Sequence, residues 1–217
     1  MELDPVRIYP ADSVRNVGAM FDRLLNMEAF VNAKCKSARY CLRNISRVRR
    51  GLTTAATETL VNAYVTSKLD YCNVLLNGLP SKLLSRIQKV QNYAARVITC
   101  HPLRESITPI LAQLHWLPVE QHVQYKVLLY VYKAVNEMAP RYITQLLKPY
   151  KPARKLRSAD KGQLVEPLYN LNSYGGRAFE MSAPRLWNVL SEKCRAAKSV
   201  NIFKSELKTH LFRHAYC

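Results

Sequence analysis

The apolar residues of the segment 29–51 recur at the spacing of an α-helix. Five of them follow one another at intervals of four, three, four and three positions: Val31, Cys35, Ala38, Leu42 and Ile45. Because an α-helix has 3.6 residues per turn, this spacing places all five side chains on one face. The pattern predicts an amphipathic helix that ends near Gly51, since glycine is common at helix C-termini.

The same periodicity predicts helices along most of the remaining chain. Thr53 or Thr54 can cap a second helix that reaches about Leu69, and Pro80 suits the start of a third helix that ends near Thr99. The inward-facing residues of this third helix are Leu83, Ile87, Val90, Ala94 and Val97. Further helices are expected over residues 107–114, 119–138 and 180–214, with a short one that ends near residue 147.

Two segments depart from the helical pattern. Residues 14–22 predict a strand and a turn around Gly18, and the segment 148–176 is rich in proline, glycine and polar residues, with a strand-like stretch at 164–168. We therefore expect a mainly α protein, with a short β element near the N-terminus and a loop-rich, partly β segment near 148–180. The expected organisation is an N-terminal segment 1–28, a helical module 29–100 and a helical C-terminal region 101–217 with a loop-rich insert at 148–176.

The charge balance of the chain points to a polyanionic partner. Lysine and arginine number 33 against 15 aspartates and glutamates, which gives a formal net charge of +18. Hydrophobic residues make up 48% of the 217 residues, so the chain can bury a core and has the composition of a folded protein. Clustered positive charge attracts phosphate, and the excess therefore indicates nucleic acid or another polyanion.

The cysteines and the N-terminus favour an intracellular protein. Six cysteines are scattered without paired spacing, and no secretory signal is recognisable, because the first residues are acidic and no apolar stretch follows them. We expect reduced thiols that lie mostly in the core. The longest apolar run, residues 127–132, is far shorter than the ~18 residues that a membrane-spanning helix needs, so no membrane segment is expected.

Positive side chains form a stripe on each of two predicted helices. The stripe of the first helix consists of Lys36, Arg39, Arg43, Arg47 and Arg50. The stripe of the third helix consists of Lys82, Arg86, Lys89 and Arg96, with Tyr93 among them. Solvated helix faces usually mix charges of both signs, whereas no acid occurs between residues 29 and 57. The unmixed stripes favour contact with phosphates over a merely solvated face.

Tyr93 and the cations of the loop-rich segment each allow two interpretations. Tyr93 can stack on a base or ribose, or it can pack over a neighbouring helix. Five cations in the loop-rich segment can lie along a nucleic-acid backbone or simply keep the loop solvated: Lys148, Lys151, Arg154, Lys155 and Arg157.

The chain lacks the residue patterns of a catalytic centre. Polymerase chemistry needs paired carboxylates that hold two metal ions, and no two acids are adjacent in this sequence. No phosphate-binding glycine loop occurs, and we expect no cofactor. His210 and His214 have an H-x3-H spacing with Cys194 and Cys217 on either side, but a structural zinc site needs cysteines at tighter spacing. Exposed histidines at a helix end are the simpler interpretation, and no metal site is expected.

Many short segments resemble one family in the same order along the chain. They include LRNI at 42–45, LVNAYVTSKLDYCN at 60–73, GLP at 78–80, QKVQNYAAR at 88–96, LHWLPV at 114–119, PRLWN at 184–188 and FKSELKT at 203–209. These segments are similar to the region after the palm of LINE-type, jockey-like non-LTR retrotransposon reverse transcriptases. The resemblance covers roughly residues 14–212.

The resemblance implies which parts of such an enzyme the chain contains. Residues 16–18 would match the leucine-glycine turn that closes the palm and grips the primer end, and the following helices would form the thumb and a C-terminal region. The catalytic aspartates of the family precede that turn and would lie outside this chain. The sequence departs from the family at Val17, where leucine is usual, and at His122, where arginine is common.

The leading hypothesis is therefore a non-catalytic, nucleic-acid-binding fragment of a reverse transcriptase. Its expected partners are template RNA and an RNA–DNA primer–template, contacted through the phosphate backbone by the two stripes. The alternatives are a retroelement relic without function and an adopted protein-interaction module. A working enzyme within this chain alone is disfavoured, because the paired carboxylates are missing.

Overall fold

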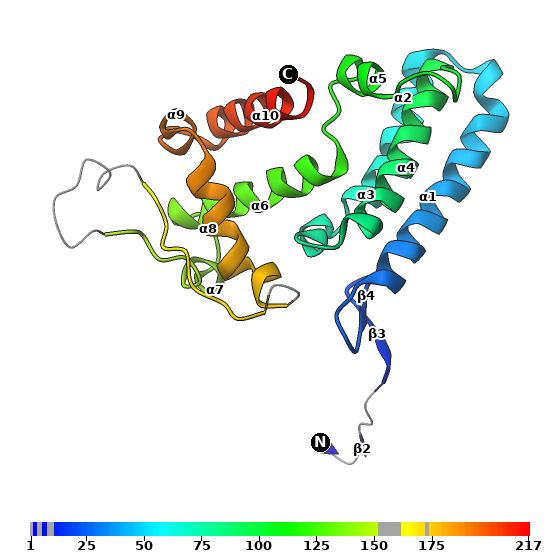
Figure 1. Ribbon diagram of the computed structural model, residues 1–217. Coiled ribbons are helices and arrows are strands. Elements are labelled where there is room, and N and C mark those ends of the chain that lie inside the picture. The colour runs from blue at the N-terminus through cyan, green and yellow to red at the C-terminus, as the bar shows by residue number, and fades with distance from the viewer. Residues whose placement is uncertain (1, 4–5, 8–10, 152–161, 172–173) are drawn as a thin grey trace. The chain divides into compact units, whose positions relative to one another are not determined.

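The computed structural model describes residues 2–3, 6–7, 11–151, 162–171 and 174–217. The fold is mainly helical, with short antiparallel strands near the N-terminus (Figure 1). This result confirms the fold class expected from the sequence.

The chain divides into two compact units. The first unit contains the chain up to Cys72 together with Leu79–Glu105, and the second contains Asn73–Gly78 and Ser106–Cys217. These boundaries differ from the ones drawn from the sequence, because the segment 1–28 joins the helices of the first unit and the segment 73–78 joins the second. The 3-10 turn η3, Asn73–Leu76, explains the second difference, since it packs against helix α6, Val119–Val135.

The first unit begins with a tight β-hairpin. Strands β3, Ser13–Asn16, and β4, Ala19–Asp22, pair in an antiparallel register that sets Asn16 opposite Ala19. The two loop residues, Val17 and Gly18, have φ angles of 44° and 80°. Positive φ at both positions defines the type I′ turn, which suits the twist of a hairpin. The predicted strand and turn around Gly18 is confirmed. A second short pair lies upstream, β1, Glu2–Leu3, with β2, Val6–Arg7.

Replacing Val17 with asparagine is expected to stabilise the hairpin by about 1 kcal/mol. Valine is β-branched and costs about 1–2 kcal/mol in a left-handed conformation, whereas Asn-Gly is the preferred pair in a type I′ turn. Urea unfolding followed by circular dichroism measures the change. Val14→Asn is the matched control, because Val14 is also exposed but lies in the regular strand β3. An equal effect of both substitutions would contradict the turn argument.

Helices of the first unit form a bundle around one core. Their bounds are α1, Glu28–Val48; α2, Thr54–Val61; α3, Ser67–Asp70; and α4, Ser81–Thr99. A π-helical turn, η2, Asn62–Thr66, joins α2 to α3 without a break. The predicted helix that reaches about Leu69 is therefore confirmed. All the inward-facing residues predicted for α1 and α4 are buried.

The ends of these helices are held by specific hydrogen bonds. The Thr53 hydroxyl accepts a hydrogen bond from the backbone of Ala56 at 3.2 Å, as expected of a helix cap. Gly51 ends a 3-10 turn, η1, Arg49–Gly51, that follows α1, and its φ is not positive, so the glycine cap expected there is wrong. The Arg49 guanidinium instead donates to the carbonyls of Leu52, Val97 and Ile98, which links the C-terminal ends of α1 and α4.

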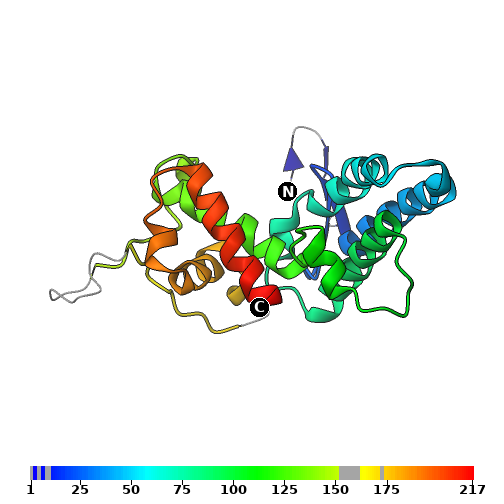
Figure 2. The same cartoon turned by 90° about the horizontal axis from the view of Figure 1, so that it is seen from above.

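The second unit contains further helices besides α6. Their bounds are α5, Thr108–Gln113; α7, Arg141–Thr144; α8, Phe179–Val189; α9, Glu192–Arg195; and α10, Val200–Tyr216. Figure 2 shows this unit from above, and both α8 and α10 pack against α6. The helical region expected at 180–214 is divided into three helices, because the Ser191 and Ser199 hydroxyls cap α9 and α10.

Aromatic side chains form the centre of the second core. The rings of Tyr132 and Phe203 stack with 4.2 Å between centroids, and Trp187 lies 5.8 Å from Phe203. The Tyr132 hydroxyl donates to the carbonyl of Ala197 at 2.7 Å. His115 packs against Phe212, with 5.9 Å between ring centroids, which makes it a packing residue of the second unit.

The loop-rich segment is attached to this core by side chains of α8. The Trp187 indole donates to the carbonyl of Gly162 at 2.8 Å, and the Asn188 side chain bonds both the N–H and the carbonyl of Leu164 at 2.9 Å. Pro149 and Leu164 form an isolated β-bridge. Within the described part of this segment no longer strand forms, so the strand-like stretch predicted at 164–168 is reduced to that bridge. A further 3-10 turn, η4, Gly175–Arg177, precedes α8.

The structure bears on two further properties, the burial of the cysteines and the character of the helices with respect to a membrane. Only Cys35 and Cys194 are buried, so the expectation that the thiols lie mostly in the core is wrong, and all six cysteines are free. Among the described residues, no helix combines the length and the apolar character needed to cross a membrane.

Candidate nucleic-acid interface

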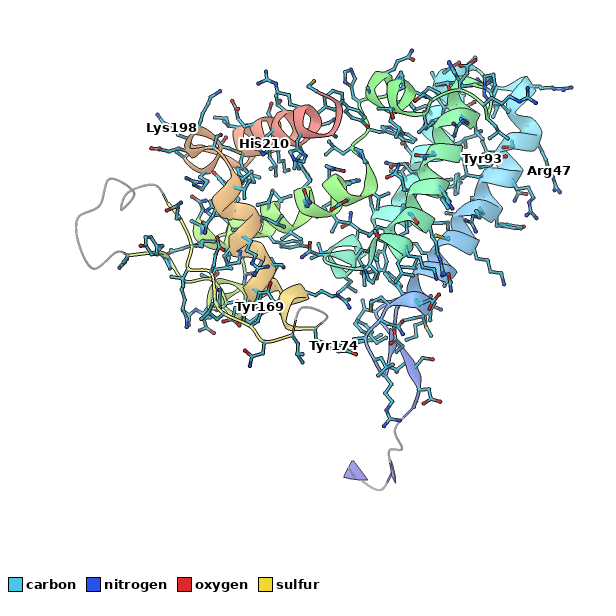
Figure 3. The ribbon with its side chains drawn as sticks, in the orientation of Figure 1. Arg47, Tyr93, Tyr169, Tyr174, Lys198 and His210 are labelled. Atoms are coloured by element: carbon cyan, nitrogen blue, oxygen red, sulfur yellow. The ribbon has the colours of Figure 1, made fainter. Side chains whose placement is uncertain are left out.

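Four of the five cations predicted on the first helix lie on the solvent-facing side of α1, and the fifth, Arg50, lies in the 3-10 turn η1 that follows it. Lys36, Arg39, Arg43, Arg47 and Arg50 are all exposed. Across the part of the chain that the structure describes, none of their side chains has a hydrogen bond or an ion pair to another residue. Figure 3 shows Arg47 projecting from the outer side of α1. The positive charge of this stripe is therefore available to an external anion.

Two of the four cations predicted on α4 are already bonded within the protein. The Arg86 guanidinium forms an ion pair with Glu28 at 2.7 Å and a hydrogen bond with Asn32 at 2.9 Å. Arg96 donates to the carbonyls of Pro102 and Glu105, the latter at 2.9 Å. Both side chains hold parts of the first unit together, so they are less available to an external anion than the cations of α1, and their contact with phosphate stays a prediction. Lys82 and Lys89 remain exposed.

The two stripes lie side by side on the first unit. Arg86 reaches Glu28 and Asn32 at the start of α1, and the Tyr93 hydroxyl lies 3.4 Å from that of Ser46 further along the same helix. Because residues three and four apart share a helix face, Ser46 borders Arg43 and Arg50. The exposed cations of the two helices and of η1 thus form one surface, called the basic face here: Lys36, Arg39, Arg43, Arg47, Arg50, Lys82 and Lys89.

Tyr93 sits in the seam between α1 and α4. Figure 3 shows Tyr93 between the two helices. Its side chain is 42% exposed, and its hydroxyl contacts that of Ser46. These contacts favour the packing interpretation of Tyr93 over the stacking one. A different tyrosine, Tyr40, is 65% exposed on α1 and was not selected from the sequence. Its position in the sequence could have indicated its place beside the stripe. Lys36 lies four residues before it, and Arg43 and Arg47 lie three and seven residues after it.

Lys34 is a buried cation on the core side of α1 that the sequence pattern did not single out. Its ammonium donates to the carbonyls of Leu69 and Tyr71 at 3.0 and 2.5 Å and lies 4.7 Å from the centre of the Phe30 ring. These bonds satisfy carbonyls at the C-terminal end of α3. Burial lowers the pKa of Lys34 from 10.5 to about 8. A pocket of about 710 Å³ opens beside it, lined also by Arg15, Lys68 and Tyr71.

Lys34 is expected to make the stability of the first unit depend on pH. Below pH 8 the folded and unfolded chains both hold its proton, and burial of the charge opposes folding. Between pH 8 and 10.5 only the unfolded chain holds the proton, so the free energy of unfolding rises with pH, by about 3 kcal/mol in total.

The comparison of the wild-type protein with Lys34→Met isolates this contribution from other titrating groups. Urea unfolding at pH 7.5 and pH 10, followed by circular dichroism, should show a larger gain for the wild type than for the variant. The same pH dependence in both proteins would contradict the lowered pKa.

The other candidate groups for binding or reactivity are metal-ligating side chains, the buried Cys194 thiol and the cations of the loop-rich segment. No group of three or more His, Cys, Asp or Glu side chains lies close enough there to hold a metal ion. Burial raises the pKa of the Cys194 thiol to about 11, which keeps it protonated at neutral pH. Of the basic run in the loop-rich segment, Lys148 and Lys151 are described, and Arg154, Lys155 and Arg157 lie outside the described residues.

Comparisons with protein-family models, with curated proteins and with solved structures found no match to this chain. The arrangement of the basic face is therefore the main guide to function.

Proposed function

We propose that this protein binds nucleic acid through the basic face of its first unit, without catalysing a reaction. The observation that carries the proposal is the set of exposed cations on α1 and α4. They are set side by side by the contacts of Arg86 and Tyr93 and have no acidic partner among the described residues. Such a surface attracts phosphates and releases their counterions on binding, which supplies most of the affinity of non-specific complexes.

The proposed contacts are with the backbone of the nucleic acid. Lysine and arginine side chains on a helix position a phosphate chain but carry little sequence information. We expect weak sequence preference and an affinity that falls steeply with salt. The acids needed for polymerase chemistry are not adjacent anywhere in the sequence, so the proposal assigns no catalytic residue.

The resemblance described above makes the proposal more specific. If the chain is the thumb and C-terminal region of a LINE-type reverse transcriptase, its partner is template RNA or an RNA–DNA primer–template inside the cell. The hairpin β3–β4 then corresponds to the end of the palm, and the helices α1 to α4 correspond to the thumb.

Titration of fluorescent single-stranded RNA and of an RNA–DNA hybrid with the purified chain across a salt series tests the proposal. A linear fall of log K with log salt is expected for both ligands. A folded sample that binds neither ligand at low salt would contradict the proposal, because the positive charge would then not be organised into a site.

A specific observation favours a second candidate, an adopted protein-interaction module or a relic that folds poorly. Apolar side chains at the hairpin are exposed, including Val14 at 57%, Val17 at 80% and Leu24 at 61%. Exposed apolar clusters mark interaction surfaces or cause aggregation. Calorimetric unfolding separates the cases, since a relic is expected to lack a cooperative transition.

A further inference from the structure

Tyr40 is the most exposed aromatic residue next to the basic face. Its side chain is 65% exposed near the middle of α1. Within the described residues its hydroxyl has no hydrogen bond, and its ring contacts no other aromatic ring. The hydrogen bonds and ring contacts of the first unit therefore give no reason for an aromatic residue at this position.

Helix geometry places Tyr40 within reach of the same ligand as the cations. Lys36 precedes it by four residues, and Arg43 and Arg47 follow it by three and seven. Residues at these spacings lie on one side of a helix, about one turn of 5.4 Å away for Lys36 and Arg43 and about two turns away for Arg47. All three cations are exposed, and no acid occurs within this stretch of α1. Phosphates held by these cations would bring the neighbouring bases of a strand over the Tyr40 ring.

We propose that Tyr40 is a base-stacking residue that makes the basic face prefer single-stranded nucleic acid. This inference rests on the proposed function, since it requires the basic face to hold a nucleic-acid backbone. An unpaired base exposes its face to a protein aromatic ring, whereas a base inside a duplex is already stacked on its neighbours. Cations combined with an exposed aromatic ring are the usual elements of proteins that bind single strands with little sequence preference.

Two ligands with the same number of phosphates test this inference. The first is a fluorescent oligodeoxyadenylate of about 12 nucleotides, within the usual range of site sizes, and the second is an abasic strand of the same length. Stacking of one base on Tyr40 should make the wild-type protein bind the adenylate about 5-fold to 100-fold more tightly than the abasic strand. Tyr40→Leu should remove this difference, and Tyr40→Phe should keep it.

Tyr142→Leu is the matched control. Tyr142 is 70% exposed in α7, and no lysine or arginine lies three, four or seven residues away from it. The preference for the adenylate should be unchanged in this variant, and circular dichroism should show that each variant keeps its helices.

The outcomes separate the two proposals. Equal binding of both strands by the wild type, or an equal loss for both strands in Tyr40→Leu, would overturn the stacking role and leave the basic face as a phosphate site. Failure of the folded wild type to bind either strand at low salt would overturn the proposed function and the stacking role with it.

Discussion

Replacing Arg39, Arg43 and Arg47 together with glutamine is expected to weaken RNA binding by about 100-fold near 0.1 M salt. Each phosphate contact contributes about 0.7 to the slope of log K against log salt for a single strand. The loss of three contacts should therefore flatten the slope by about 2 units, which amounts to about two powers of ten in affinity between 1 M and 0.1 M salt. Fluorescence anisotropy across a salt series measures both quantities. All three side chains are exposed, so the fold should be unaffected.

The control for this experiment must remove the same charge from another surface. Lys204, Lys208 and Arg213 are exposed on α10 in the second unit, and their replacement with glutamine lowers the net charge by the same three units. A much smaller change in slope is expected. If both triple variants lose affinity equally, binding depends on the net charge of +18 and the basic face has no special role.

Phe203→Ala is expected to lower the free energy of unfolding of the second unit by about 3–5 kcal/mol. Its side chain is 0% exposed, stacks on Tyr132 and touches Trp187, so the substitution leaves a cavity at the centre of this core. A typical domain has only about 5–15 kcal/mol of stability, and this loss therefore removes much of it.

Tryptophan fluorescence during urea unfolding reports on this unit alone, since Trp116 and Trp187, the two tryptophans of the chain, both belong to it. Ile202→Ala provides the control on the same helix. Ile202 is 50% exposed, and its replacement should change the stability by about 0.5 kcal/mol or less. Equal destabilisation by both substitutions would show that the aromatic cluster is not the centre of the core.

The site illustrates which residues a sequence pattern can and cannot assign. Helical periodicity correctly placed Lys36, Arg43 and Arg47 on the exposed side of α1, because their direction depends only on the helix that contains them. Arg86 and Arg96 have the same pattern but bond to other elements. Their partners come from residues up to 58 positions away, and no local rule connects such residues.

Lys34, on the core side of α1, is another residue whose contacts a local sequence pattern cannot predict. Its position between Val31 and Cys35 placed it near the apolar face, where a lysine is costly unless its charge is satisfied. The carbonyls of Leu69 and Tyr71 that satisfy it lie 35 and 37 residues further along the chain. Only the packing of α3 against α1 brings the donor and the acceptors together.

Most of the helices, the hairpin turn at Gly18 and the outward direction of the α1 stripe can be predicted from the amino-acid sequence. Each of these follows from interactions between residues a few positions apart, namely periodic burial, helix capping and backbone conformation. The tertiary structure alone decided that the segment 73–78 packs with the second unit, that α1 and α4 present one basic face, and that Tyr93 lies in the seam while Tyr40 faces solvent. These features depend on contacts between distant segments, whose partners are chosen by the packing of the whole core.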